Sequence, residues 1–431
     1  MINRRSMFKA VGAFGVTTAA GPLVSMPAGA KSPNPGSPAI ELSRRPLPPS
    51  PAVPLAELES RISRVRAEMS KAGFDVIVLT DPVNIRYLTD YIIDLRSRTR
   101  PSFAVLTKDS LAIIGSYELK WVEGIPRAFS SVTYSGYLPE VVDAVASNIG
   151  ATPASARRRI GLDYGRDMLG HGSLELVDRL KALSSDSSVT SATDVLWRVR
   201  VIKSAFEVEM VKTINDIVNR SFDQAIVHAR VGITEYELYQ ILQAQIYLNG
   251  AETSGRLRVV FSDSDFDFAR GPSDRKLRRG DYIWVDHYLG YGGYVSDRCR
   301  LARCGEPADW EIDTYKRVHS LTIELAKSIR PGQSCRDVYS KFLRMWKEAD
   351  LGELFALPGR IGHGDGLDQT EPPSLSATDE TVFKAGMIFT VGPKLEKNGA
   401  VFQFEEVFLV GHRENEFLSD FAPEQIPVIK A

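Results

Sequence analysis

The sequence predicts a small α/β domain followed by an α+β domain. Helix and strand patterns alternate to about residue 195, and beyond it helices precede strands without strict alternation. At 431 residues the chain is too long for one ordinary domain, and its hydrophobic fraction of 43% is enough to fill two cores. These observations assign residues 56–195 to the first domain and residues 196–431 to the second.

The N-terminal segment combines the features of an export signal. Arg4 and Arg5 precede a mildly apolar run over residues 10–20, and Ala28-Gly29-Ala30 offers a small-x-small cleavage site. This order resembles the twin-arginine signal, so residues 1–30 are predicted to be removed on export to the periplasm or the medium. The alternative is a tail with an accidental arginine pair. No stretch of the sequence is long and apolar enough to cross a membrane.

Residues 31–55 contain eight prolines and therefore predict an extended linker. The formal net charge of the chain is -1. We expect neither nucleic acid nor an anionic membrane as the main partner, because both attract proteins through excess positive charge. Three cysteines are too few for a disulfide framework, although a single bridge stays open as an alternative in an oxidising compartment.

The first domain is expected to begin with a helix and continue with buried strands. Apolar residues recur with helical spacing from Leu55 to Met69, and Gly73 ends the pattern. Short apolar runs predict strands at 76–79, 103–106 and 111–114.

The second domain begins with helical patterns. One helix is predicted over about 206–229, and a capping box of Thr234 and Glu237 begins the next. Later segments predict strands around 259–260, 282–287 and 295–301, a helix over 310–328, and strands around 387–390 and 401–410.

Two aspartates stand within apolar strands on either side of a glycine-rich turn. Asp286 follows the run 282–285, and Asp297 follows the run 294–296. Paired strands can direct both carboxylates at one point, and converging carboxylates favour a cation between them. A solvated hairpin is the alternative interpretation.

His363 and Glu405 are the other candidate metal ligands. Gly362 and Gly364 flank the histidine, which indicates a backbone that approaches something closely. In the segment 404–407 adjacent side chains point to opposite faces, so one glutamate should face inward and need a partner. The alternatives are a structural histidine and a solvated edge strand. Two aspartates, one histidine and one glutamate suit manganese, iron, cobalt or zinc.

The order and spacing of these motifs resemble the pita-bread metallohydrolases, which include methionine aminopeptidase, prolidase, aminopeptidase P and the metal-free creatinase. The resemblance runs from about residue 56 to the C-terminus. It implies a creatinase-type N-terminal domain, a pita-bread catalytic domain, a homodimer, and metal ligation by Asp286, Asp297, His363 and Glu405. Further motifs that carry it are Leu79–Pro82, Asn84–Thr89, Ile202–Ser204, Asp274–Leu277, Thr370–Pro373 and Gly386–Thr390.

The sequence departs from this family at the metal site. The family's remaining ligand glutamate falls at Gly392, and its two catalytic histidines fall at Ala269 and Thr370. The glycine after the first aspartate is replaced by His287-Tyr288. A lost carboxylate removes negative charge from a site built for two divalent ions, so we expect one ion.

Proton transfer then needs a substitute for the missing histidines. Asp365, Asp368 and Glu371 are nearby in the sequence, and Asp368 is the preferred catalytic candidate, with a solvated loop as the alternative. In the first domain, Arg98 resembles by position the arginine with which creatinase holds its substrate carboxylate. A solvated basic loop is the alternative there.

Three functions follow from the resemblance. The favoured one is an exported metal-dependent hydrolase, similar to Xaa-Pro aminopeptidase, that acts on a short peptide or small amide substrate. The second is a pita-bread enzyme with altered chemistry, such as a creatinase-like C–N hydrolase or a lyase, which the missing histidines favour and which could need no metal. The third is a binding protein without catalysis.

Overall fold

The computed structural model describes residues 50–92, 99–116, 119, 128–150, 158–183, 188–262, 266–267, 270–353 and 359–430. The predicted signal peptide, most of the predicted linker, Arg98 and Ala269 lie outside these ranges. No helix in the described ranges combines the length and apolar character that crossing a bilayer requires.

The N-terminal part is built around a mixed six-stranded sheet with the order β4-β3-β2-β1-β5-β6. Strand β1 pairs antiparallel with β2 and parallel with β5. Its elements are α1 (Leu55–Ala72), β1 (Val76–Leu79), α2 (Pro82–Thr89), β2 (Phe103–Thr107), β3 (Leu111–Gly115), β4 (Ser130–Thr133), α3 (Leu138–Gly150), β5 (Arg159–Leu162), α4 (Leu174–Lys181), β6 (Ser188–Ser191) and α5 (Thr193–Arg200).

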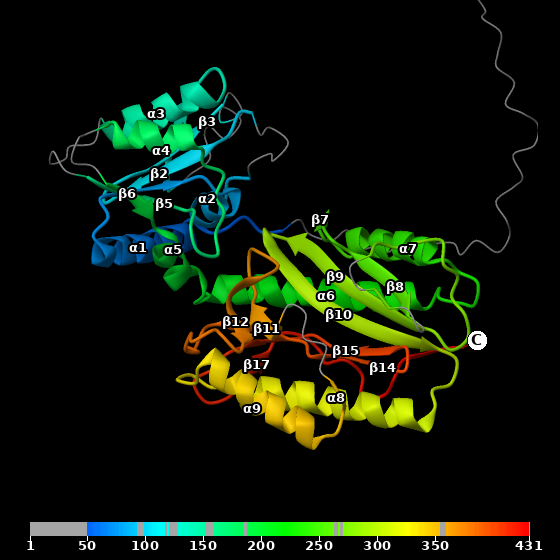
Figure 1. Ribbon diagram of the computed structural model, residues 1–431. Coiled ribbons are helices and arrows are strands. Elements are labelled where there is room, and N and C mark those ends of the chain that lie inside the picture. The colour runs from blue at the N-terminus through cyan, green and yellow to red at the C-terminus, as the bar shows by residue number, and fades with distance from the viewer. Residues whose placement is uncertain are drawn as a thin grey trace, which may run out of the picture. The chain divides into compact units, whose positions relative to one another are not determined.

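Helices cover both faces of this sheet, because alternate strand residues point to opposite sides. Val76 and Val78 of β1 pack in one core with residues of α3 and α4. Ile77 and Leu79 of the same strand pack in another core with residues of α1 and α5 (Figure 1). The result is a domain of three layers, and the α/β class that the sequence predicted is confirmed. The predicted boundary after residue 195 falls inside α5.

The described C-terminal part contains two five-stranded sheets and a two-stranded sheet of β14 and β15, with helices outside them. One sheet has the order β18-β10-β9-β7, with β8 also paired to β9, and the other has the order β12-β11-β13-β16-β17. Its elements are α6 (Ala205–Ile226), α7 (Glu235–Leu248), β7 (Thr253–Ser254), β8 (Arg258–Ser262), β9 (Tyr282–Tyr291), β10 (Tyr294–Cys304), α8 (Asp309–Ser328), α9 (Cys335–Glu348), β11 (Arg360–Gly364), β12 (Glu371–Ser376), β13 (Ile388–Val391), β14 (Lys394–Lys397), β15 (Ala400–Gln403), β16 (Glu406–Leu409), β17 (Glu416–Phe417) and β18 (Val428–Ile429).

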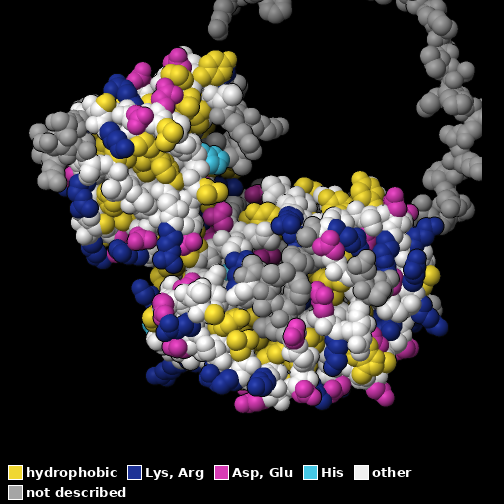
Figure 2. Space-filling model, viewed as in Figure 1, with side chains coloured by type: hydrophobic (Ala, Val, Ile, Leu, Met, Phe, Trp, Pro, Cys, Tyr) yellow, Lys and Arg dark blue, Asp and Glu magenta, His cyan; other side chains and the backbone are white. Residues whose placement is uncertain are grey.

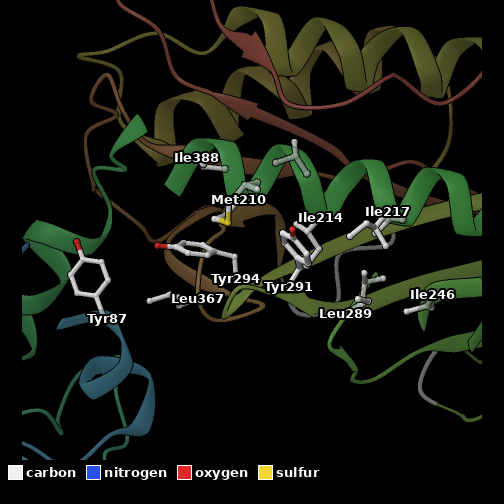
Figure 3. Packing of buried hydrophobic residues seen from close by; sticks show 14 of the residues in the cluster. Tyr87, Met210, Ile214, Ile217, Ile246, Leu289, Tyr291, Tyr294, Leu367 and Ile388 are labelled. Carbon is white, nitrogen blue, oxygen red and sulfur yellow. The ribbon is translucent and has the colours of Figure 1, made fainter. Parts of the chain in front are cut away.

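The helices pack as two pairs on opposite sides of these sheets. Helices α6 and α7 lie against β8, β9 and β10, whereas α8 and α9 lie against strands of the second sheet and β15 (Figure 1). Figure 3 shows Met210, Ile214 and Ile217 of α6 facing Leu289 and Tyr291 of β9. The apolar stripe of α6 thereby forms a fixed support beneath the hairpin that carries both candidate aspartates.

One predicted strand was wrong in its extent. The segment 401–410 is two strands, β15 and β16, that separate at Phe404-Glu405. The chain divides there because β15 pairs with β14, whereas β16 pairs with β13 in a different sheet. Glu405 therefore lies at a junction between sheets.

The cysteines and the surface charges fit the composition. Cys299, Cys304 and Cys335 are buried and free, so the single bridge left open by the sequence does not form. Figure 2 shows acidic and basic side chains intermingled over the visible face of the molecule.

Candidate metal centre

The β9–β10 hairpin directs Asp286 and Asp297 to one side of its sheet. Asp286 lies opposite Cys299, and Asp297 precedes Cys299 by two residues, so the two aspartates share a face. Their strands are joined by a two-residue turn of Gly292 and Gly293, with φ values of 61° and 85°. These values match the turn whose twist suits an antiparallel hairpin and which requires residues that tolerate positive φ.

Glu405 and Glu406 separate to opposite sides of the chain, as their adjacency predicted. Glu405 joins the two aspartates, and one carboxylate oxygen of each of the three lies within 4.8 Å of the others. Glu406 is 1% exposed, and its carboxylate lies 3.2 Å from Arg298 Nη2. The alternative of a solvated edge strand is therefore wrong for Glu406.

His363 is held on β11 between two tightly packed glycines. A Cβ at Gly362 would lie 2.5 Å from the Thr390 carbonyl oxygen, and one at Gly364 would lie 2.5 Å from that of Pro372. The close approach predicted from these glycines is thus to the backbones that flank β11. The histidine Nδ1 donates to the Gly364 carbonyl at 2.8 Å, which leaves the lone pair of a neutral ring on Nε2, 3.1 Å from Asp297 Oδ2.

The four predicted ligands meet in one cavity of about 300 Å³. Two of their buried oxygens, Asp286 Oδ1 and Glu405 Oε2, accept no hydrogen bond from the described residues. Buried oxygens of this kind are costly unless a donor or a cation satisfies them. The residues present therefore fit a cation, and the lone pair of His363 Nε2 beside a carboxylate fits the same conclusion.

Burial and close approach raise the pKa values of two of these carboxylates. Burial, followed by repulsion from Asp297, raises the pKa of Asp286 to about 7. Burial and the same two aspartates raise the pKa of Glu405 well above its ordinary value. A divalent cation would relieve this repulsion, and it would compete with protons for the same oxygens.

The position of the missing glutamate is filled by a neighbour. A Cβ on Gly392 would collide with Glu405 Cγ, so Glu405 occupies the space that a side chain at residue 392 would need. Thr370, at the position of one missing histidine, lines the cavity, and its hydroxyl accepts from Arg360 Nη2 at 3.2 Å.

Asp368 lies apart from the described residues that line the cavity. Its carboxylate accepts from Arg200 Nη2 at 2.8 Å. Glu371 is buried between Arg200 and Lys203, at 2.6 and 2.8 Å. Asp365 is fully buried and accepts from the Gly366 backbone. The structure thus gathers Asp286, Asp297 and Glu405 into one cluster and places His363 against Asp297, whereas Asp368 is not joined to them.

Several cavity residues were missed by the sequence analysis. Gln369 Nε2 donates to Asp297 Oδ1 at 3.0 Å, and Gln403 Nε2 donates to Glu405 at 3.1 Å. Arg258 Nη1 lies 3.4 Å from Asp286 Oδ2. The alternation of β8 could have placed Arg258 on a face, but the pairing of β8 with β9 is not written in the local sequence.

Both parts of the chain match known protein families. Residues 61–202 match the creatinase/prolidase N-terminal domain, and residues 209–412 match metallopeptidase family M24. An uncharacterized peptidase of Staphylococcus saprophyticus is 25% identical over 366 residues, which cover 84% of this chain and 99% of that protein.

Two solved structures share the fold. Dipeptidase PepE from Mycobacterium ulcerans has a TM-score of 0.75 and 24% identity, and the match covers 88% of this chain and all of that one. X-Pro aminopeptidase from Thermotoga maritima has a TM-score of 0.73 and 21% identity, with 85% and 99% covered. The chain is therefore a member of the pita-bread superfamily, with a creatinase-type N-terminal domain followed by a catalytic domain of metallopeptidase family M24.

Proposed function

We propose that the chain is an exported metal-dependent hydrolase that cleaves an amide bond in a short peptide or small molecule, as Xaa-Pro aminopeptidases do. The observation that carries this proposal is the convergence of Asp286, Asp297 and Glu405, with His363 against Asp297. The unpartnered oxygens of Asp286 and Glu405 support a cation there. Membership of the superfamily supports the hydrolytic chemistry.

One ion is the proposed stoichiometry. Asp286, Asp297, His363 and Glu405 would hold it, and a bound divalent ion would supply polarisation of the scissile carbonyl and acidification of water. Gly392 offers no ligand, and Arg258 already places a positive charge 3.4 Å from Asp286. A second divalent ion beside that arginine would meet repulsion and too few oxygens.

Neighbouring residues hold this set in place. Gln369 fixes one oxygen of Asp297, and the Gly364 carbonyl fixes the ring of His363. Such partners orient the groups that face the reacting atoms. To act as the base, Asp368 would have to leave Arg200, so we assign proton transfer to the carboxylates inside the cavity.

The test is metal analysis joined to hydrolysis of a panel of Xaa-Pro dipeptides. We expect about one ion per chain, loss of turnover in a chelator and recovery with manganese. Asp297→Asn should lower both metal content and kcat/KM, the latter by roughly a hundredfold or more. Asp313→Asn, at an exposed carboxylate on α8, is the control that should change neither.

The second candidate is a creatinase-like C–N hydrolase or a lyase that works without a resident ion. The ion pair of Arg258 with Asp286 favours it, because a protein cation there reduces the need for a metal. Turnover of any substrate that persists in the metal-stripped protein would select this candidate. Tight metal binding without turnover of any substrate would select a binding protein instead.

Export and assembly are further parts of the proposal. Replacing Arg4 and Arg5 together by lysine should retain the protein in the cytoplasm, as measured by cell fractionation. The matched control is the same exchange at Arg44 and Arg45, a second arginine pair in the predicted linker, which should not change export.

The proposed assembly is a homodimer. Light scattering should give the mass of a homodimer, and the mass of a monomer would contradict this proposal.

A further inference from the structure

The cavity that collects the carboxylates is also lined by cations. Among the described residues around it, four carry positive side chains, Arg256, Arg258, Arg360 and Lys394, against three carboxylates and His363. Arg258 begins β8, Arg360 begins β11 and Lys394 begins β14, so the cations come from different strands that the fold brings together. With His363 counted as neutral, the lining is net positive even when every carboxylate is ionised.

These cations are held in different ways. Arg360 Nη2 donates to Thr370 at 3.2 Å, and Arg258 lies 3.4 Å from Asp286. The Lys394 ammonium lies 4.8 Å from the centroid of the Trp284 ring, a cation–π contact within the cavity wall. Arg256 is exposed and makes neither a hydrogen bond nor a salt bridge with the described residues. A guanidinium carries five N–H donors, so the contact of Arg360 with Thr370 and the exposure of Arg256 leave donors that an oxyanion can use.

Four positive side chains outnumber the three carboxylates in this cavity, so an additional anion is electrostatically favoured. Burial lowers the pKa of Lys394, although Cys299, Glu405 and Asp286 act in the other direction. A divalent ion held by the carboxylates would add further positive charge to the same small space. A ligand that brings its own negative charge would offset this repulsion, and the cavity volume of about 300 Å³ accommodates a small molecule.

We infer that this cavity selects an anionic ligand, a small molecule whose carboxylate, or a comparable oxyanion, is held by Arg256, Arg360 and Lys394 beside the carboxylate cluster. The inference rests on the proposed function in one respect. If the chain hydrolyses amides, its substrates are amides that carry a carboxylate on the part bound by these cations. Arg258 is assigned mainly to Asp286, and the other three cations to the ligand. Binding itself needs no metal, because the lining is net positive without one.

The experiment measures binding by calorimetry with N-acetylglycine, its neutral isostere N-acetylglycinamide, and inorganic phosphate. Each is titrated into the chelator-treated and the manganese-loaded protein. We expect N-acetylglycine to bind about ten- to a hundredfold more tightly than the amide in both forms, and more weakly as salt is raised. Phosphate that binds better than N-acetylglycine would name a phosphoryl group as the anion and keep the assignment of the cations.

Two variants test the assignment of residues. Arg256 is exposed, so Arg256→Gln should fold normally, whereas Arg360→Gln removes a half-buried guanidinium. Each variant should reduce the preference for the carboxylate about tenfold without changing metal content. Arg317→Gln, on the surface of α8, is the charge-matched control and should leave the preference intact.

Three results would overturn the inference. They are equal binding of N-acetylglycine and N-acetylglycinamide, a preference that disappears when metal is removed, and a preference that only Arg98→Ala abolishes. The second result would assign the anion to the ion itself. A protein that binds no metal but keeps the carboxylate preference would contradict the proposed function while leaving this inference standing.

Discussion

At the scale of single residues, the centre depends on two neighbouring side-chain positions, Gly392 and Glu405. The superfamily resemblance expects a glutamate at residue 392, and the sequence has glycine. The structure shows that the freed space is occupied by the side chain of Glu405. The loss at residue 392 and the placement of the candidate ligand Glu405 are thus physically linked.

Restoring the lost carboxylate should increase metal binding. Gly392→Glu must displace Glu405, but it adds a fourth carboxylate to Asp286, Asp297 and Glu405, so we expect more than one ion per chain at saturating manganese. Gly392→Ala causes the same collision without adding a ligand, and it should lower metal affinity. Metal analysis of both variants distinguishes the effects, and identical stoichiometries would show that residue 392 is not part of the centre.

At the scale of elements, the β9–β10 hairpin sets the spacing of two candidate ligands. Its register keeps Asp286 and Asp297 on one face, and the turn of Gly292 and Gly293 fixes that register. Gly293 has φ 85°, and a Cβ there would lie 2.5 Å from Arg86 Nε. Both the backbone and the space around it therefore require glycine.

Gly293→Ala should lower the free energy of unfolding by about 2 kcal/mol, because alanine is strained at positive φ and must also displace Arg86. Urea denaturation measures the change. The control is Gly271→Ala, where φ lies outside the left-handed region and nothing lies within 4 Å of the added Cβ. An equal effect of both substitutions would mean that the turn does not constrain the hairpin.

At the scale of the whole molecule, a buried ion network links distant segments of the chain. Arg200 of α5 donates to Asn84 of α2 at 2.9 Å and to Glu371 of β12 at 2.6 Å. Lys203 donates to the other oxygen of Glu371 at 2.8 Å. Glu371 also accepts from the backbone of Leu367, so the network holds the loop that carries Asp368 and Gln369.

This network predicts a loss of stability in acid. Burial alone would raise the pKa of Glu371, but Lys203 and Arg200 outweigh it and lower the pKa to about 2. A carboxylate with a depressed folded pKa stabilises the protein above its unfolded value of 4.5, and this contribution is lost as the pH falls from there toward 2. The contribution at neutral pH is about 3 kcal/mol.

Glu371→Gln tests this contribution directly. The substitution leaves Arg200 and Lys203 buried without their counter-charge, so unfolding at pH 7 should become easier by about 3–5 kcal/mol. The difference from the unmodified protein should shrink toward pH 2. Urea denaturation at several pH values measures it, with the exposed Glu380→Gln as control. A constant difference across that range would contradict the assigned pKa.

Local patterns in the sequence determined the two-domain fold and the position of each candidate ligand in the chain. Strand alternation placed Asp286 and Asp297, and the adjacency of Glu405 and Glu406 correctly sent them to opposite sides. These inferences succeeded because a hairpin and a pair of neighbouring residues are defined by short-range geometry, which the order of residues encodes directly.

Only the tertiary structure decided what surrounds those ligands. The approach of Arg258, Arg360 and Lys394 to the carboxylates depends on pairings between strands far apart in the chain, and no local periodicity reports such pairings. The capture of Asp368 by Arg200, 168 residues away, has the same origin. The sequence alone therefore named the groups that could hold an ion, while long-range packing decided which charges those groups meet.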